Sequence, residues 1–128
     1  MNYGMGGLIS AHVDSSGWLS KLNEGSSEDI MYGGARFITF MVYLNDVLSG
    51  GRTVFPQLGL SVKPVLGSAL FWFNVGPNMK YDSRVLHLGC PVMHGNKWIA
   101  NKWIKILSQF KHYPCNDKRK HYNIFSNK

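Results

Sequence analysis

The stretch RFITFMVYLNDVLSGGRTVFP, residues 36–56, decides the fold. Residues 36–44 form a mostly apolar run, and Gly50-Gly51 separates it from a second short run at 53–56. Such runs between glycines are typical of strands joined by turns. The same rhythm continues in both directions along the chain. It predicts strands over residues 7–13, 36–44, 53–56, 61–63, 68–74, 85–92 and 97–104.

Helical periodicity is scarce, so we expect a mainly β domain, a mostly antiparallel sandwich or jelly roll. The polar segment 15–35 is too long for a hairpin, and loops of that length are often functional. The segment MHGN, residues 93–96, is predicted to be a short hairpin turn between two apolar strands. We assign residues 1–110 to the domain and 111–128 to a basic tail.

The 128 residues are enough for about one domain with one core. The net charge of +7 is uneven, because residues 1–96 balance to zero and the whole excess lies in residues 97–128. Charge in a tail is usually solvated, and no nucleic-acid recognition motif accompanies it. No apolar run reaches the roughly 18 residues that span a bilayer. We therefore expect neither a nucleic-acid partner nor a membrane partner.

His12 and Asp14 are candidates for a metal site. On a strand, residues i and i+2 share a face, so an imidazole and a carboxylate would lie side by side. A third ligand must come from a remote element, and only His87 among the other histidines lies in a strand-like run. Two histidines and one carboxylate suit non-haem Fe(II). Spacing alone also permits a buried core histidine at position 87 and an exposed polar pair. The other candidates for the third ligand are His94, His112 and His121.

Lys97 adds a second chemical feature, ten residues after His87. A cation near a metal with open positions can bind the far carboxylate of a dicarboxylate whose other end chelates the metal. A lone lysine at the start of a strand is more often a surface residue. Lys97 gains weight only in combination with the candidate ligands.

The combination resembles the 2-oxoglutarate and Fe(II)-dependent dioxygenases, specifically the catalytic domain of the collagen prolyl 4-hydroxylase alpha subunit. The resemblance runs from about Tyr3 to Cys115, and its most specific stretches are YLNDVLSGGRTVFP and GCPVMHGNKWIANKWI. It implies a double-stranded β-helix of the jelly-roll or cupin type. It also implies peptidyl-proline 4-hydroxylation of procollagen-like peptides with Fe(II), 2-oxoglutarate, O2 and ascorbate, releasing succinate and CO2.

Residue by residue, the resemblance assigns His12, Asp14 and His87 to iron and Lys97 to the distal carboxylate of 2-oxoglutarate. It assigns Tyr3 and Thr39 to the cosubstrate pocket, Arg36 and Trp103 to the peptide groove, and Cys90 and Cys115 to a disulfide. A disulfide is typical of an oxidising compartment. The family further implies the endoplasmic reticulum lumen and protein disulfide isomerase as a beta subunit. The opening MNYGMGGLIS has no signal-peptide pattern, so this localisation rests on the resemblance alone.

The chain departs from the family pattern in three respects. Ile9 stands where the family usually has Tyr, and Ala11 where it usually has Pro. The chain also starts eleven residues before the first ligand, so we expect it to lack the helices and strands that precede the family's β-helix. Two alternatives follow: a non-catalytic paralogue that binds peptide or partner, and a dioxygenase that acts on another peptidyl acceptor.

Overall fold

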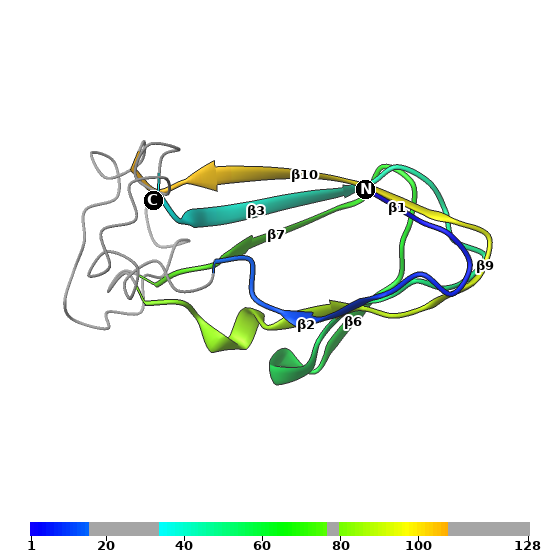
Figure 1. Cartoon of the computed structure of the whole chain (residues 1–128), viewed down its shortest axis with the longest axis horizontal. Coiled ribbons are helices and arrows are strands. Elements are labelled where there is room, and N and C mark those ends of the chain that lie inside the picture. Colours follow the sequence, from blue (N-terminus) through cyan, green and yellow to red (C-terminus); the bar gives the residue numbers. More distant parts are fainter. Residues whose placement is uncertain (16–33, 77–79, 108–128) are drawn as a thin grey trace, which may run out of the picture.

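The computed structural model describes residues 1–15, 34–76 and 80–107, and its strands form two four-stranded sheets and a two-stranded one. The larger sheet has the order β1-β10-β3-β7, and the second has the order β2-β8-β5-β6. Figure 1 shows the two as facing layers. The strands of the larger sheet are β1 (Asn2–Tyr3), β10 (Lys97–Lys105), β3 (Arg36–Tyr43) and β7 (Ala69–Phe73). The second contains β2 (Ile9–His12), β8 (His87–Gly89), β5 (Thr53–Phe55) and β6 (Leu60–Val62). The third pairs β4 (Ser49–Gly50) with β9 (Val92–His94).

Strand β3 is an inner strand of the larger sheet, between β10 and β7, and its side chains alternate between buried and less buried positions. Phe37, Thr39, Met41 and Tyr43 are buried on one face, whereas Phe40 on the other face is 41% exposed. This alternation is the period-two pattern of a strand with one face on a core. Strand β3 pairs antiparallel with β10 along one edge and with β7 along the other.

The main core lies between the two layers. Phe55 of β5 packs edge-on against Trp72 of β7, with ring centroids 5.4 Å apart, and so joins the sheets. Offset and edge-on aromatic pairs contribute packing energy beyond their buried area. The buried members of this cluster are Met41, Tyr43, Phe55, Trp72, Val85 and Ile99.

The strand predicted over residues 85–92 is wrong as a single element. The structure divides it into the end of the 3-10 helix η2 (Ser83–Val85), strand β8 and the start of β9. Pro91 has no backbone N–H and cannot continue a ladder at that point. Its carbonyl instead accepts from the N–H of Gly51 at 2.8 Å, and the N–H of Cys90 donates to Arg52 at 2.8 Å. The chain therefore turns from one sheet into another.

The predicted hairpin at residues 93–96 is also wrong. Strand β9 pairs with β4, whereas β10 pairs with β1 and β3, so the strands flanking this turn belong to different sheets. Gly95 makes the turn with a φ of 91°, which L side chains rarely adopt. The apolar pattern of the sequence does not indicate that β9 and β10, which are consecutive in the chain, pair with strands of different sheets.

The other predicted strands are confirmed with small changes at their ends, and the mainly β prediction holds within the described residues. Strand β2 is shorter than predicted, so Asp14 lies in a bend beyond its end. Strands β1 and β4 and the 3-10 helices η1 (Pro56–Leu58) and η2 were not predicted. No helix in the described segments has the length and apolar character to cross a membrane. The predicted tail 111–128 and most of the segment 15–35 lie outside the described residues.

Candidate metal centre

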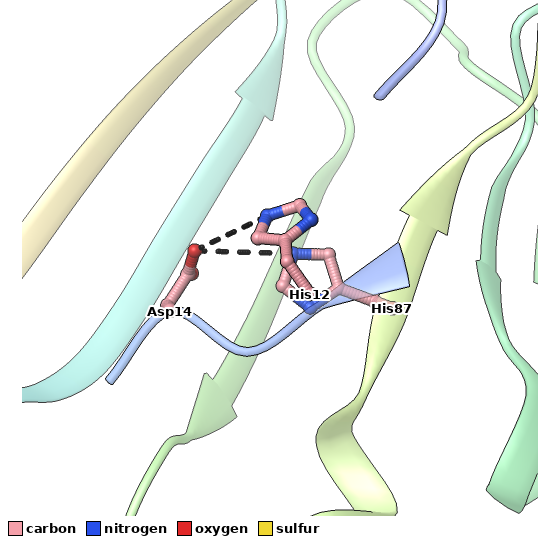
Figure 2. Close-up of side chains that lie close together, drawn as sticks. All are labelled: His12, Asp14 and His87. Atoms are coloured by element: carbon pink, nitrogen blue, oxygen red, sulfur yellow. Dashed lines mark ion pairs between the residues drawn. The ribbon is translucent and has the colours of Figure 1, made fainter. Parts of the chain in front are cut away.

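His12, Asp14 and His87 come together where β2 ends beside β8. His12 and His87 are direct partners in the antiparallel register, and their ring centroids lie 4.3 Å apart. Asp14 Oδ1 is 3.6 Å from His12 Nε2 and 3.9 Å from His87 Nε2, as the dashed lines in Figure 2 show. One ligand atom from each residue lies within 4.8 Å of the others. The three residues are therefore close enough together to be candidates for holding one metal ion.

Both histidines present Nε2 to the centre because Nδ1 is used elsewhere. His12 Nδ1 lies 2.8 Å from the Ser10 carbonyl oxygen, and His87 Nδ1 lies 3.0 Å from the Val85 carbonyl oxygen. A carbonyl only accepts, so Nδ1 donates in both cases and Nε2 keeps its lone pair. Burial lowers the pKa of His87 below its usual value, which favours the neutral form that binds metals.

A chain of hydrogen bonds orients the carboxylate of Asp14. The Thr39 hydroxyl donates to Asp14 Oδ2 at 2.6 Å and accepts from Asn74 Nδ2 at 2.9 Å. Trp72 Nε1 donates in turn to Asn74 Oδ1 at 2.9 Å. Such outer hydrogen bonds commonly fix the geometry of metal ligands. They occupy Oδ2 and leave Oδ1 facing the two histidines.

The residues present fit an Fe(II) ion. Two imidazoles and one carboxylate are the donor set that suits a non-haem Fe(II) ion. The other polar atom of each side chain has a hydrogen-bond partner, so His12 Nε2, Asp14 Oδ1 and His87 Nε2 are the atoms that remain to bind a metal. All three residues line a cavity of about 230 Å³.

Lys97 lines the same cavity and is 4% exposed. Its Nζ donates to Thr53 Oγ1 at 3.3 Å and lies 5.5 Å from the Tyr43 ring centroid. In the described part of the chain no carboxylate forms an ion pair with it. Burial lowers the pKa of Lys97 from 10.5 to about 8. A buried cation without a counter-ion indicates a place for an anionic ligand.

Thr53 lines this end of the cavity and Tyr43 contacts it from behind, and sequence reasoning missed both. The Tyr43 hydroxyl donates to Thr53 Oγ1 at 2.7 Å, so Thr53 accepts from Tyr43 and from Lys97. Its own hydroxyl proton is therefore available to a ligand. A threonine in a strand is common, and nothing local distinguished this one.

The structure places the remaining predicted residues as follows. Tyr3 lines the cavity, with Lys97 Nζ 5.8 Å from its ring centroid. Thr39 is fully buried behind Asp14 and is not among the residues that line the cavity, so its cosubstrate role stays a prediction. Arg36 lies over the Trp103 ring at 3.6 Å and donates from Nη1 to the Asp14 carbonyl at 3.4 Å.

Cys90 is half-buried, whereas Cys115 lies outside the described residues, and so does the predicted disulfide between them. Of the alternative third ligands, His94 is exposed on β9, and His112 and His121 lie outside the described residues. His87 is the histidine that the fold brings to His12 and Asp14.

The sequence of residues 1–105 matches the family described as the 2OG-Fe(II) oxygenase superfamily. The chain belongs to this superfamily. The predicted dioxygenase assignment is therefore confirmed, and the superfamily's description names both Fe(II) and 2-oxoglutarate. The three ligands, the cavity and Lys97 all lie within the matched residues.

Two curated relatives illustrate the similarity of this oxygenase to prolyl 4-hydroxylase subunits. It is 40% identical over 114 residues to prolyl 4-hydroxylase subunit alpha-1 of Gallus gallus, covering 89% of this chain and 21% of that protein. It is 43% identical over 115 residues to prolyl 4-hydroxylase subunit alpha-3 of Homo sapiens, covering 90% and 20%. The chain spans about a fifth of the length of these relatives.

A solved structure supports the fold. The viral collagen prolyl hydroxylase of Paramecium Bursaria Chlorella virus-1, in complex with 2OG, superposes with a TM-score of 0.65 and 32% sequence identity. The match covers 80% of this chain and 54% of that one. Together with the antiparallel sheets, it confirms the jelly-roll prediction.

Proposed function

We propose that the chain hydroxylates proline in procollagen-like peptides at C4, using Fe(II), 2-oxoglutarate and O2. One oxygen atom enters the proline as a hydroxyl group, and the other enters the succinate formed when 2-oxoglutarate loses CO2. The observation that carries the proposal is a single cavity with the three metal ligands on its wall and unpaired Lys97 beside them. The similarity to prolyl 4-hydroxylase subunits supports proline as the acceptor.

The metal ligands have a defined part in this reaction. Bound Fe(II) would supply the activation of O2 and the oxidation of a C–H bond. His12, Asp14 and His87 hold one side of the ion and leave the cavity side for 2-oxoglutarate and O2. Thr39 keeps Asp14 Oδ1 directed at the ion by binding Oδ2.

Lys97 orients the cosubstrate. Its ammonium pairs with the distal carboxylate of 2-oxoglutarate, and the free proton of Thr53 adds a hydrogen bond to the same group. Anchoring one end of a chelating dicarboxylate places its other end at the metal. Apolar Ile9, Met41 and Ile99 line the same cavity and limit water near the metal.

Arg36 and Trp103 form the part of the cavity wall that we assign to the acceptor peptide. The guanidinium covers the indole at 3.6 Å and reaches the Asp14 carbonyl, so both side chains are fixed next to a ligand loop. The Arg36 guanidinium stacked on the Trp103 indole offers a planar, well-ordered surface against which a proline ring and its peptide groups can pack. This placement agrees with the peptide-groove role expected for both residues.

The proposal is tested with the full chain loaded anaerobically with Fe(II), then mixed with 2-oxoglutarate, O2 and a Pro-Pro-Gly repeat peptide. We expect succinate and a peptide heavier by one oxygen atom, and His12→Ala to yield neither. A chain that binds Fe(II) and 2-oxoglutarate but oxidises no proline peptide would contradict prolyl hydroxylation. A chain that binds neither ligand by calorimetry would be a non-catalytic module.

Ile9 favours a second candidate, oxidation of a different peptidyl acceptor. Its apolar side chain lines the cavity where the family usually places a tyrosine hydroxyl, which changes the polarity of the wall. A panel of proline, lysine and other peptides, scored by the gain of one oxygen atom, separates the two candidates.

The proposal extends to the remaining features that the resemblance implies. Ascorbate would restore Fe(II) after turnover without an acceptor, and its effect is measured as sustained succinate release. A Cys90–Cys115 disulfide, the endoplasmic reticulum lumen and protein disulfide isomerase as a beta subunit form one consistent set. Mass mapping of Cys90 and Cys115 peptides without reduction and co-purification with the isomerase test this set.

A further inference from the structure

Trp72 of β7 reaches the metal centre by two separate routes. Its ring packs edge-on against the His87 ring, with centroids 4.9 Å apart. Its Nε1 donates at 2.9 Å to Asn74 Oδ1, the first link of the hydrogen-bond chain that ends at Asp14. Trp72 is 7% exposed and belongs to the larger sheet, whereas His87 lies on β8 of the second sheet. One side chain therefore contacts one candidate ligand directly and a second through hydrogen bonds.

The indole fixes the direction of each hydrogen bond in this chain. An indole N–H only donates, so the atom of the Asn74 amide that faces it must be the carbonyl oxygen. The amide nitrogen then faces Thr39 and donates to Oγ1 at 2.9 Å. Because Thr39 Oγ1 accepts from this amide, its single proton is directed to Asp14 Oδ2, 2.6 Å away. The indole N–H thus ensures that Thr39 acts as a donor to the carboxylate.

The strand pairing holds this chain in place. Thr39 and Trp72 are direct partners in the antiparallel register of β3 and β7, and both side chains are buried. Asn74 follows the end of β7, where its backbone N–H donates to the Phe37 carbonyl at 2.8 Å. Thr39 is 0% and Asn74 2% exposed, so water does not compete for their hydrogen bonds. Buried networks whose polar atoms have partners orient their side chains strongly.

Aromatic contacts enclose the His87 ring as well. Phe55 of β5 stacks on this ring with centroids 5.4 Å apart, and it also packs edge-on against Trp72. His87 Nδ1 is held in addition by the Val85 carbonyl. The two aromatic rings therefore restrict rotation of the imidazole away from the direction that presents Nε2 to the metal centre.

We infer that Trp72 positions two of the three candidate metal ligands, His87 through its ring and Asp14 through its N–H. Asn74 is the relay that gives the second route its direction. The inference concerns how the chain holds Fe(II) and applies to any acceptor, so it does not depend on the proposed prolyl hydroxylation. It requires the N–H and the ring of Trp72 to have separable effects on metal binding.

The direction of the chain is tested by Asn74→Asp, which keeps the shape of the side chain. A carboxylate only accepts, so it can still bind the indole N–H but competes with Asp14 for the Thr39 proton. Fe(II) affinity, measured by anaerobic calorimetry, should fall by about 10–100-fold. Co(II) bound in place of Fe(II) should show a changed d–d absorption spectrum, which reports the arrangement of the donor atoms. Asn2→Asp, on exposed β1, is the matched control and should keep both properties.

The two routes are separated by replacing Trp72. Trp72→Phe keeps a ring against His87 but removes the N–H, and it should lower Fe(II) affinity by about 10-fold. In a Thr39→Val background the same change should have no further effect, because the route to Asp14 is already broken. Trp72→Leu also removes the ring and should lower affinity by up to about 10-fold more in either background. Trp98→Phe, at a 45% exposed site on β10, is the control.

A destabilised variant separates positioning from a merely structural role. Ile106 packs in the second cluster, with Phe37 and Val75, and takes no part in the hydrogen-bond chain. Ile106→Val should lower Tm by about 5 °C and keep wild-type Fe(II) affinity and the wild-type Co(II) spectrum. A loss of affinity as large as that of Trp72→Phe would assign the effect to stability and overturn the inference.

Two further results would overturn it. Unchanged Fe(II) affinity and Co(II) spectrum in both Asn74→Asp and Trp72→Phe would show that neither side chain positions a ligand. An undiminished effect of Trp72→Phe in the Thr39→Val background would show that the indole N–H does not act through this chain. None of these measurements uses a peptide, so a failure to oxidise proline would refute the proposed function alone. A wild type that binds no Fe(II) would refute both.

Discussion

At the metal end of the cavity each candidate ligand has a hydrogen bond to a second group, whereas at the other end the one hydrogen bond that Lys97 makes within the described residues is to the Thr53 hydroxyl. Asp14 is oriented by a chain of three hydrogen bonds that ends at Trp72. Lys97 is buried to a similar degree but has no anionic partner in the described residues. The candidate metal ligands are thus oriented by contacts within the protein, whereas the charge of Lys97 is left for an anionic ligand to neutralise.

The largest effect is expected from loss of a metal ligand. His12→Ala removes one of three donors and should lower Fe(II)-dependent succinate formation by roughly 1,000-fold or more. Metal binding is measured by anaerobic calorimetry and succinate by NMR. His94→Ala is the matched control, since His94 is exposed on β9. An equal loss in both variants would show that the effect is not specific to the metal centre.

The next largest effect, from replacing Lys97, distinguishes 2-oxoglutarate binding at the lysine end from Fe(II) binding at the metal end. Lys97→Met should raise the KM for 2-oxoglutarate by about 100-fold, because a charge-assisted hydrogen bond is lost, while Fe(II) affinity stays unchanged. It should also raise the free energy of unfolding of the unloaded chain by about 1–3 kcal/mol, since a buried unpaired cation is removed.

Lys102→Met is the control for this substitution. Lys102 lies on the same strand but is exposed on the opposite face, so KM and stability should stay near wild type. A fall in stability for Lys97→Met would contradict the view that this lysine is held at a cost to the fold.

The support of the metal end is tested by Thr39→Val. It removes the donor to Asp14 Oδ2 and the acceptor for Asn74 Nδ2. Fe(II) affinity should fall by about 10–100-fold and stability by about 1–3 kcal/mol. Thr53→Val, at the lysine end, should instead weaken 2-oxoglutarate and spare Fe(II). If both variants weaken both ligands equally, the two ends are not independent.

The most gradual effect is a pH dependence at the lysine end. Because the pKa of Lys97 is lowered from 10.5 to about 8, the unfolded chain binds more protons than the folded one between these values. Stability of the unloaded chain should therefore rise between about pH 8 and 10.5, by at most about 3 kcal/mol.

The KM for 2-oxoglutarate should move in the opposite sense and increase above about pH 8, since the ligand needs the charged amine. Urea unfolding and initial rates, each measured from pH 7 to 10, provide both curves. Lys97→Met should lose both dependences, and a variant that kept them would assign the titration to another group.

Sequence predicted the candidate metal ligands but not the hydrogen bonds that orient them. His12, Asp14 and His87 were identified through residue type and family resemblance. The role of Thr39 in the cosubstrate pocket stays a prediction, and what sequence did not indicate is that its hydroxyl donates to Asp14 Oδ2. That contact joins residues 25 positions apart, and no local periodicity reports it.

The errors in the fold have the same origin. Residues 85–92 and the turn at 93–96 have the apolar pattern of strands and a hairpin, and the residues flanking the turn are strands in the structure. The predicted pairing of these strands with each other was wrong, because pairing depends on which distant strand lies alongside each one. Pro91 and Gly95 were visible in the sequence, but their effect on sheet membership was not.

The sequence by itself determined the strand alternation of residues 36–44, the types of the metal ligands and the presence of a lysine in the final strand. These follow from period-two patterning and from the chemistry of each side chain. Only the tertiary structure decided that His87 pairs with His12, and that Lys97 is buried with no anionic partner among the residues that the structure describes. The physical reason is that burial and hydrogen-bond satisfaction depend on neighbours from other strands, which a linear pattern does not specify.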